Sequence, residues 1–385
     1  MFTKEEIEKK AIEFKLDPSD VERDYIQSWI INEVSKNNFL GQKLTLKGSC
    51  ALRKLYFPFT RFAKDIDFSA DTHIDENILK EQLLIIGKEV QKHTGVIFTE
   101  KVNVRDKNLP KDTKVDALEA RLYFKGIYTD GKFDLKTQVD VTQNDKFYLP
   151  SETRPIIHPY SDSEKFINSK IVSQKVEDII ATKFITLIHR QKPGDFFDLV
   201  QCTFIKNELK INRSDIIKAL LSRTDFGERL EETRNYFFNL PIKEKYCDAW
   251  GGILVPAQNS ISFDDAHGLF LSSIGDFFDE MALHISTVID GSIGIGKNLF
   301  REQIISAGKQ KRLVELTYSD KVRKIEPYKL EYYTREDGQA FEYFWGFDQT
   351  GGTSGANSIK MFFVDKIQNA NKTMESFSPR WDVEF

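Results

Sequence analysis

Residues 47–69, KGSCALRKLYFPFTRFAKDIDFS, decide how the first half of the chain folds. The segment QKLTLKG that leads into them alternates like a strand, SCALRKLYF is typical of a helix, and KDIDFSA predicts a second strand. Because side chains at positions i and i+2 of a strand point to one face, Asp65 and Asp67 present two carboxylates side by side. The Gly48-Ser49 turn before the helix offers backbone N–H groups and a hydroxyl to a phosphate.

A third carboxylate, that of Asp140 in TQVDVTQ, lies on another predicted strand and can join the first two. Three converging carboxylates repel one another unless a cation neutralises them, and an all-oxygen ligand set suits magnesium. Magnesium in turn suits phosphates, so the pattern indicates an in-line phosphoryl or nucleotidyl transfer. Acid-x-acid triplets are also common in a chain with 59 acidic residues, so an exposed strand end beside an ordinary Gly-Ser turn is the alternative interpretation.

The rest of the sequence predicts an α+β fold in three parts. Helical patterns precede residue 37 and recur near 76–94, and Asp130-Gly131 predicts a hairpin between two strands. The period is mostly helical from Val172 to residue 305, and short alternating segments follow from Leu313. We expect an α+β core with N-terminal helices at 1–170, a mainly helical domain at 171–296 and a small β-barrel at 297–385.

Composition excludes several classes of protein. The formal net charge of -4 gives no global attraction to nucleic acid, so such binding requires a local basic surface. The three cysteines lie far apart without a C-x-x-C pair, and the six histidines are scattered, which argues against a disulfide framework or a zinc site. No run approaches the ~18 apolar residues of a membrane span. We expect a soluble, cytoplasmic protein without a membrane partner.

Four blocks of the sequence together resemble the AbiEii/AbiGii toxin family of nucleotidyltransferases, known from bacterial abortive-infection and toxin–antitoxin systems. The blocks are LKGSCALRKLY, RFAKDIDFS, QVDVT and VEDIIATKFITLIHRQKPGDFFDL, and the likeness runs from about Glu22 to Leu199. The resemblance implies a nucleotidyltransferase core of the DNA polymerase β type. It also implies an NTP substrate and two magnesium ions.

The resemblance assigns roles to residues of this sequence. The implied metal ligands, which are also catalytic, are Asp65, Asp67 and Asp140. The implied catalytic lysine is Lys183, which would contact the nucleotide phosphates. The other implied nucleotide-binding residues are Gly48, Ser49, Arg61, Arg190, Asp195 and Asp198. Helical spacing places Lys183 and Arg190 on one face together with Leu187, although a solvated face with two ordinary cations gives the same pattern. Two features depart from the family: the long gap between Ser49 and Asp65, and Gly194 where arginine is common.

A second resemblance covers about residues 297–385, which are similar to a WYL domain, a small SH3-like β-barrel. In this sequence Phe344-Trp345-Gly346 stands in place of the naming triplet. The resemblance implies nucleic-acid contacts by Arg323, Lys360 and Lys366. Basic residues outnumber acidic ones over 297–330, and nearby aromatic side chains can stack on bases, although they can equally form the barrel core.

These features predict a magnesium-dependent nucleotidyltransferase that moves NMP from an NTP to an acceptor, with the 3′ end of tRNA as the expected acceptor. Such an enzyme would act as a toxin in a toxin–antitoxin or phage-defence system, with a cognate antitoxin as partner. Transfer onto a protein or a small molecule is the alternative within the same chemistry. A non-catalytic regulator that binds nucleotide or nucleic acid is the alternative from another class.

Overall fold

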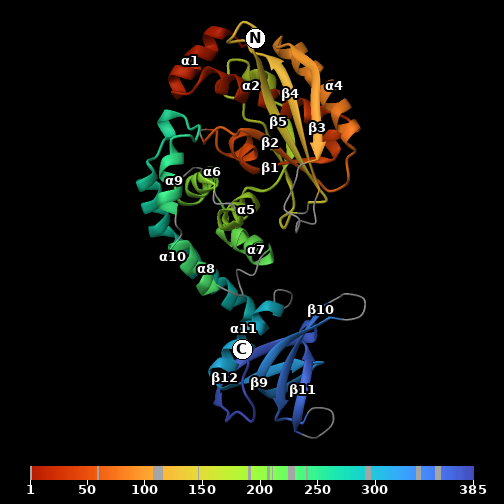
Figure 1. Cartoon of the computed structure of the whole chain (residues 1–385), viewed down its shortest axis with the longest axis vertical. Helices are drawn as coiled ribbons and strands as arrows, with labels where there is room; N and C mark the ends of the chain where they lie inside the picture. Colours follow the sequence, from red (N-terminus) through yellow and green to blue (C-terminus); the bar gives the residue numbers. More distant parts are fainter. Residues whose placement is uncertain are drawn as a thin grey trace. The chain divides into compact units, whose positions relative to one another are not determined.

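The computed structural model of the chain describes residues 2–58, 60–106, 116–145, 147–189, 192–205, 209, 211–223, 230–239, 242–290, 296–334, 340–351 and 357–385. The fold is mixed α+β, which confirms the predicted class (Figure 1). It divides into two compact units, Met1–Leu220 with Leu240–Ser273 and Leu221–Asn239 with Ile274–Phe385. The sequence led us to expect three domains, and that division stays a prediction.

A seven-stranded mixed sheet forms the centre of the first unit, with strand order β3-β4-β5-β2-β1-β7-β6. Its strands are β1 (Leu44–Lys47), β2 (Asp65–Ala70), β3 (Phe98–Asp106), β4 (Ala117–Lys125), β5 (Asp134–Gln143), β6 (Glu152–Pro155) and β7 (Lys170–Ser173). The pairs β2–β5 and β1–β7 are parallel, and the other neighbours are antiparallel. The predicted Asp130-Gly131 turn connects β4 to β5, and both of its residues have positive φ.

One face of this sheet is apolar and packs against helices. In β2 the buried Ile66, Phe68 and Ala70 alternate with Asp65, Asp67 and Ser69, which point to the other face. The helices α2 (Pro18–Lys36) and α4 (Glu76–Thr94) pack on each other and on strands of the sheet (Figure 1). Phe98, which pairs with Phe124 on the apolar side, touches α4 at Gly87. The polar face is therefore left for the charged side chains of β2, β4 and β5.

The remaining elements of the first unit surround this sheet. They include α1 (Lys4–Phe14), η1 (Leu40–Gln42), α3 (Gly48–Ala51), η2 (Leu52–Tyr56), η3 (Ser163–Phe166), α5 (Val176–His189), α6 (Pro193–Leu199), η4 (Val200–Phe204), α9 (Ile242–Trp250) and η5 (Ala257–Asn259). Two helices, α7 (Arg213–Arg223) and α10 (Phe263–Asp290), each contain residues of both units. Within the described ranges, no helix is long and apolar enough to span a membrane.

The second unit contains a separate antiparallel sheet of order β11-β10-β9-β8-β12. Its elements are α8 (Leu230–Phe238), α11 (Gly296–Lys309), β8 (Arg312–Tyr318), β9 (Lys321–Thr334), β10 (Ala340–Asp348), β11 (Ser358–Phe363), η7 (Val364–Lys366) and β12 (Ile367–Ser376). Apolar side chains of the strands and of α11 build its core, with Ile304, Val314 and Phe344 fully buried. The C-terminal strands expected from the sequence are present, and an SH3-like barrel closure stays a prediction.

Candidate functional site

The turn between β1 and α3 lies directly against a carboxylate of β2. Gly48 has a φ of +68°, a conformation that glycine adopts without the steric cost borne by other residues. A Cβ atom at this position would lie 2.9 Å from Oδ2 of Asp67. Both the backbone angle and the close approach therefore require glycine, and they bring the predicted phosphate-type turn into contact with one of the predicted acidic residues.

Strand register places the predicted carboxylates on the polar face of the sheet. Lys47 of β1 pairs with Asp67 of β2, and Asp67 pairs with Asp140 of β5. Residues in register on neighbouring strands share a face, so the carboxylates of Asp67 and Asp140 are neighbours. Asp65 lies two residues before Asp67 on the same strand and therefore on the same face. Gln138, which pairs with Asp65, donates a hydrogen bond from Nε2 to Oδ1 of Asp140 at 3.0 Å.

A short hydrogen-bond relay adjoins these carboxylates and was not found from the sequence. Lys47 Nζ lies 2.6 Å from Oδ2 of Asp145, and the same oxygen accepts a hydrogen bond from Ser69 Oγ at 2.5 Å. Ser69 lies two residues after Asp67 on the same face of β2. Alternation marks Ser69 as a polar-face residue, but its link to Asp145 depends on a loop whose path the sequence pattern does not reveal.

Five of the predicted nucleotide-binding residues meet in one ionic cluster, formed by Ser49, Arg61, Lys183, Asp195 and Asp198, of which the last three are buried. Lys183 Nζ lies 2.9 Å from Ser49 Oγ, 2.7 Å from Asp195 Oδ1 and 2.8 Å from Asp198 Oδ2. Arg61 binds Asp198 through two nitrogens, with Nε to Oδ1 at 2.6 Å and Nη2 to Oδ2 at 2.7 Å. Arg61 also donates to Ser49 Oγ, and that hydroxyl donates to Asp198 Oδ2 at 2.8 Å. The helices α5 and α6 and the turn after β1 thereby converge on one hydroxyl.

The electrostatics of the ionic cluster keep Lys183 and Asp198 charged. Burial raises the pKa of the Asp198 carboxyl, but the adjacent Arg61 and Lys183 outweigh that effect and bring its pKa to about 2. Burial lowers the pKa of the Lys183 ammonium, and the charges of Asp198 and Asp195 more than reverse this, so its pKa is raised. The lysine and the carboxylate are therefore both ionised at neutral pH.

Gly194 has a packing role in this cluster. A Cβ atom at Gly194 would lie 3.1 Å from Cζ of Arg61, because the guanidinium rests on the backbone at the start of α6. A side chain at this position would require the Arg61 guanidinium to shift by a few tenths of an ångström. The family commonly has an arginine at the position of Gly194. In this chain the guanidinium of Arg61, from another part of the sequence, lies against that position.

The donor set at the sheet suits a hard cation, although its side chains do not converge as a finished site. Among the described residues, no group of three or more His, Cys, Asp or Glu side chains is arranged so that it could hold a metal ion. The adjacent Asp67 and Asp140, with Asp65 on the same face, nevertheless offer the carboxylate oxygens that magnesium takes. The residue types therefore suit a magnesium ion, and their arrangement as a metal site stays a prediction.

The other predicted site residues lie elsewhere. Arg190 falls outside the described residues. In the second unit, Arg323 Nη1 and Lys360 Nζ lie 2.8 Å and 3.1 Å from Oδ2 of Asp348, which is fully buried. Lys366 is exposed. Two of the three cations predicted to meet nucleic acid are thus paired with a carboxylate of their own sheet.

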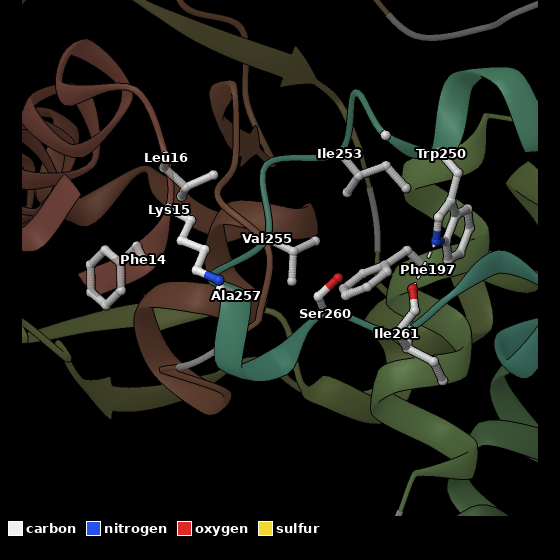
Figure 2. Close-up of a pocket in the computed structure, with 11 residues that line it drawn as sticks. Phe14, Lys15, Leu16, Phe197, Trp250, Ile253, Val255, Ala257, Ser260 and Ile261 are labelled. Atoms are coloured by element: carbon white, nitrogen blue, oxygen red, sulfur yellow. Dashed lines mark hydrogen bonds between the residues drawn. The ribbon is translucent and has the colours of Figure 1, made fainter. Parts of the chain in front are cut away.

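A cavity of about 450 Å³ is lined in part by α6 through Phe197 (Figure 2). Phe14, Lys15 and Leu16 at the end of α1 line one part, and Phe197 and Trp250 line another. Residues 251–261, which connect α9 to α10, line the rest of the cavity. A hydrogen bond from Trp250 Nε1 to the Ile261 carbonyl, at 2.9 Å, joins the two ends of this connection. Phe197 belongs to the helix that carries the two aspartates of the ionic cluster, so α6 borders both the cavity and the cluster.

Comparison with known proteins identifies one family. The family model described as "Nucleotidyl transferase AbiEii toxin, Type IV TA system" matches residues 31–266, which is more than half of the chain. Its range contains both the row of carboxylates and the ionic cluster. The chain is also similar to the solved structure of MenT4, a nucleotidyltransferase toxin from Mycobacterium tuberculosis H37Rv, with 13% identity and a TM-score of 0.45 over 74% of this chain and 93% of that one. No curated protein matches the chain significantly.

Proposed function

Because the chain belongs to the AbiEii family of nucleotidyltransferase toxins of type IV toxin–antitoxin systems, we propose that it moves a nucleoside monophosphate from an NTP to a hydroxyl of an RNA acceptor. The 3′ end of tRNA is the first candidate acceptor, and transfer to it would stop translation and growth. The family implies a cognate antitoxin as partner. The observation that supports this proposal most is the packing of the Gly48 turn on Asp67, which itself lies in register with Asp140.

Asp65, Asp67 and Asp140 would hold magnesium in the working enzyme. Magnesium bound there supplies positive charge that stabilises the charge developing on the transferred phosphate. Asp140 is only 5% exposed and accepts a hydrogen bond from Gln138, which fixes its orientation. We assign to Asp140 the removal of the proton from the attacking hydroxyl, since a carboxylate held beside the reacting atoms is suited to act as a general base.

Ser49 and Lys183 would hold the triphosphate. An ammonium has three N–H donors, and in this structure Ser49, Asp195 and Asp198 engage the three donors of Lys183. A phosphate oxygen would therefore replace Ser49 Oγ as the third acceptor, while the two aspartates keep the ammonium in place and charged. The hydroxyl released in this exchange can donate to the phosphate in turn.

Transfer of label from α-labelled NTPs to total RNA, in the presence of magnesium, tests the proposal. The full chain should label RNA, and Asp67→Asn and Asp140→Asn should each reduce labelling by at least about a hundredfold. Asp134→Asn is the matched control, because Asp134 lies at the other end of β5, paired with Lys125 at 2.6 Å, and should retain full activity.

Expression in cells gives a second readout. The unsubstituted chain and Asp134→Asn should arrest growth, and Asp67→Asn should not. Full labelling of RNA by Asp67→Asn would overturn the proposed mechanism. Label found in protein and absent from RNA would instead overturn the assignment of the acceptor.

A further inference from the structure

The charged row on the polar face continues beyond Asp140. Glu119 of β4 pairs with Asp140, and Arg105 of β3 pairs with Glu119. Together with the pairs already described, the row runs Lys47, Asp67, Asp140, Glu119 and Arg105 across five neighbouring strands. Neighbouring strands lie about 4.8 Å apart, so Arg105 is about 10 Å from Asp140 across the sheet. The carboxylates of the proposed site therefore have a cationic edge on this side.

Glu119 fixes two arginines through a single oxygen. Its Oε1 lies 2.9 Å from Nη2 of Arg105 and 2.8 Å from Nη2 of Arg121, and it also accepts a hydrogen bond from Nε of Arg105 at 3.1 Å. The Glu119 side chain is 9% exposed, whereas Arg105 and Arg121 are 64% and 32% exposed. Because one carboxylate faces two guanidinium groups, the trio carries a net positive charge. With this oxygen shared by two arginines, Glu119 serves as their anchor and not as a further metal ligand.

The arginines retain donors for a ligand. Each guanidinium has five N–H donors in a fork that matches a phosphate, and Glu119 engages only a minority of them. Arg121 Nε is buried and has no hydrogen-bond partner in the described structure. Arg105, held at its base by Glu119, presents most of its side chain to solvent. A phosphate that bridges the two arginines would engage N–H donors of both forks that Glu119 does not engage.

The arginines lie on the side of the carboxylates where an acceptor, and not the NTP, would place a phosphate. Ser49 and its partner Lys183, which we assign to the triphosphate, lie on the β1 side of Asp67. Arg105 and Arg121 lie on the opposite side of the row, beyond Asp140. An acceptor hydroxyl must reach the carboxylates from the side that the triphosphate leaves open.

We propose that Arg105 and Arg121, oriented by Glu119, bind a backbone phosphate of the acceptor RNA next to its attacking hydroxyl. This inference rests on the proposed function and adds the surface that recognises the acceptor. It requires no change in the binding of the NTP. The two arginines act in binding and Glu119 acts as their positioning residue.

Binding and kinetics of the full chain test the inference. Arg105→Gln and Arg121→Gln should each weaken binding of unlabelled tRNA about tenfold, measured by fluorescence anisotropy against a labelled competitor, and should reduce the salt dependence of log K by about one unit of slope. KM for the RNA should rise by a similar factor while KM for the NTP stays within about twofold. Glu119→Ala should reproduce part of the loss, because both arginines lose the oxygen that anchors them.

Arg154→Gln is the matched control, because it removes the same charge from β6 at the far edge of the sheet and should leave RNA affinity unchanged. Urea unfolding of each variant shows whether a lower RNA affinity reflects lost RNA contacts or a less stable fold. Arg105→Lys, which keeps the charge but lacks the guanidinium fork, should bind RNA with an affinity between those of the unsubstituted chain and Arg105→Gln. Unchanged RNA affinity in both arginine variants, in a chain that still labels RNA, would overturn this inference alone. Failure of the unsubstituted chain to label any RNA would overturn the proposed function as well.

Discussion

Replacement of Gly48 by alanine perturbs the proposed site through a single added carbon. The new Cβ would lie 2.9 Å from Asp67 Oδ2, whereas ordinary van der Waals contact begins at 3.4 Å, so the carboxylate must move by about 0.5 Å. Catalytic groups must be held within about 0.5 Å of the productive geometry, and a displacement of about 1 Å can cost about a hundredfold. We therefore expect Gly48→Ala to lower kcat by about tenfold to a hundredfold.

The stability cost of the same substitution comes from the backbone. A φ of +68° costs a residue with a Cβ about 1–2 kcal/mol relative to glycine. Gly131 provides a matched control, because its φ is +73° and its added Cβ would meet only Lys125 Cβ, at 3.9 Å. Gly131→Ala should therefore lose about the same free energy of unfolding as Gly48→Ala, about 1–2 kcal/mol, while its kcat stays within about twofold of that of the unsubstituted chain.

Urea unfolding and transfer of label to RNA, measured on both variants, decide between the two effects. Equal stability losses with a kcat loss confined to Gly48→Ala would support the contact with Asp67. Equal kcat values for the two variants would refute the reasoning, because the turn would then have no influence on the carboxylate.

Three further outcomes follow from buried groups. Asp24→Asn should cost about 3–5 kcal/mol in urea unfolding, because the buried Asp24 lies 2.6 Å from Arg53 Nε and 2.8 Å from Lys54 Nζ and both cations would lose their carboxylate. Asp198 has a folded pKa of about 2, below its ordinary 3.8, so its ionised form contributes about 2 kcal/mol to the free energy of unfolding above pH 3.8. This contribution should be lost as the pH falls from 3.8 toward 2. The difference in unfolding free energy between the unsubstituted chain and Asp198→Asn should therefore shrink over that window. Iodoacetamide should modify Cys247, which is exposed, and leave the two buried cysteines unmodified in the folded chain, as mass spectrometry would show.

Local patterns of the sequence predicted much of the fold around the site. Alternation in KDIDFSA places Asp65 and Asp67 on the polar face, as expected. The Asp-Gly turn forms as predicted because only its two residues and their immediate neighbours determine it. Each of these features depends on residues that are close in the chain.

Features that depend on strand order were beyond the reach of local patterns. Glu119 is visible in the sequence as a polar residue of a strand, but its place beside Asp140 follows only from the register between β4 and β5. The helical period grouped Lys183 with Arg190, whereas the described partners of Lys183 include Asp195, which lies on the next helix after a proline turn. Such pairings arise from tertiary packing, which periodicity within one element does not encode.

In the second unit, the sequence likewise showed the basic residues but not their ion-pair partner. The basic residues Arg323 and Lys360 stand out in the sequence as candidates for contact with nucleic acid. The structure joins both to Asp348, which comes from the strand between theirs in the sheet. Local charge was visible in the sequence, but the carboxylate that shares it was not, because cross-strand neighbours depend on the order of the strands.

The position of the label in the NTP tests the central claim most directly. The full chain would be incubated with magnesium, total RNA and a mixture of the four NTPs labelled at either the α- or the γ-phosphate. Nucleotidyl transfer predicts that the α-label enters RNA and that the γ-label leaves entirely as pyrophosphate, in equal molar amounts. A γ-label found in RNA, or bound NTP with no transfer of the α-label to RNA, would contradict the account.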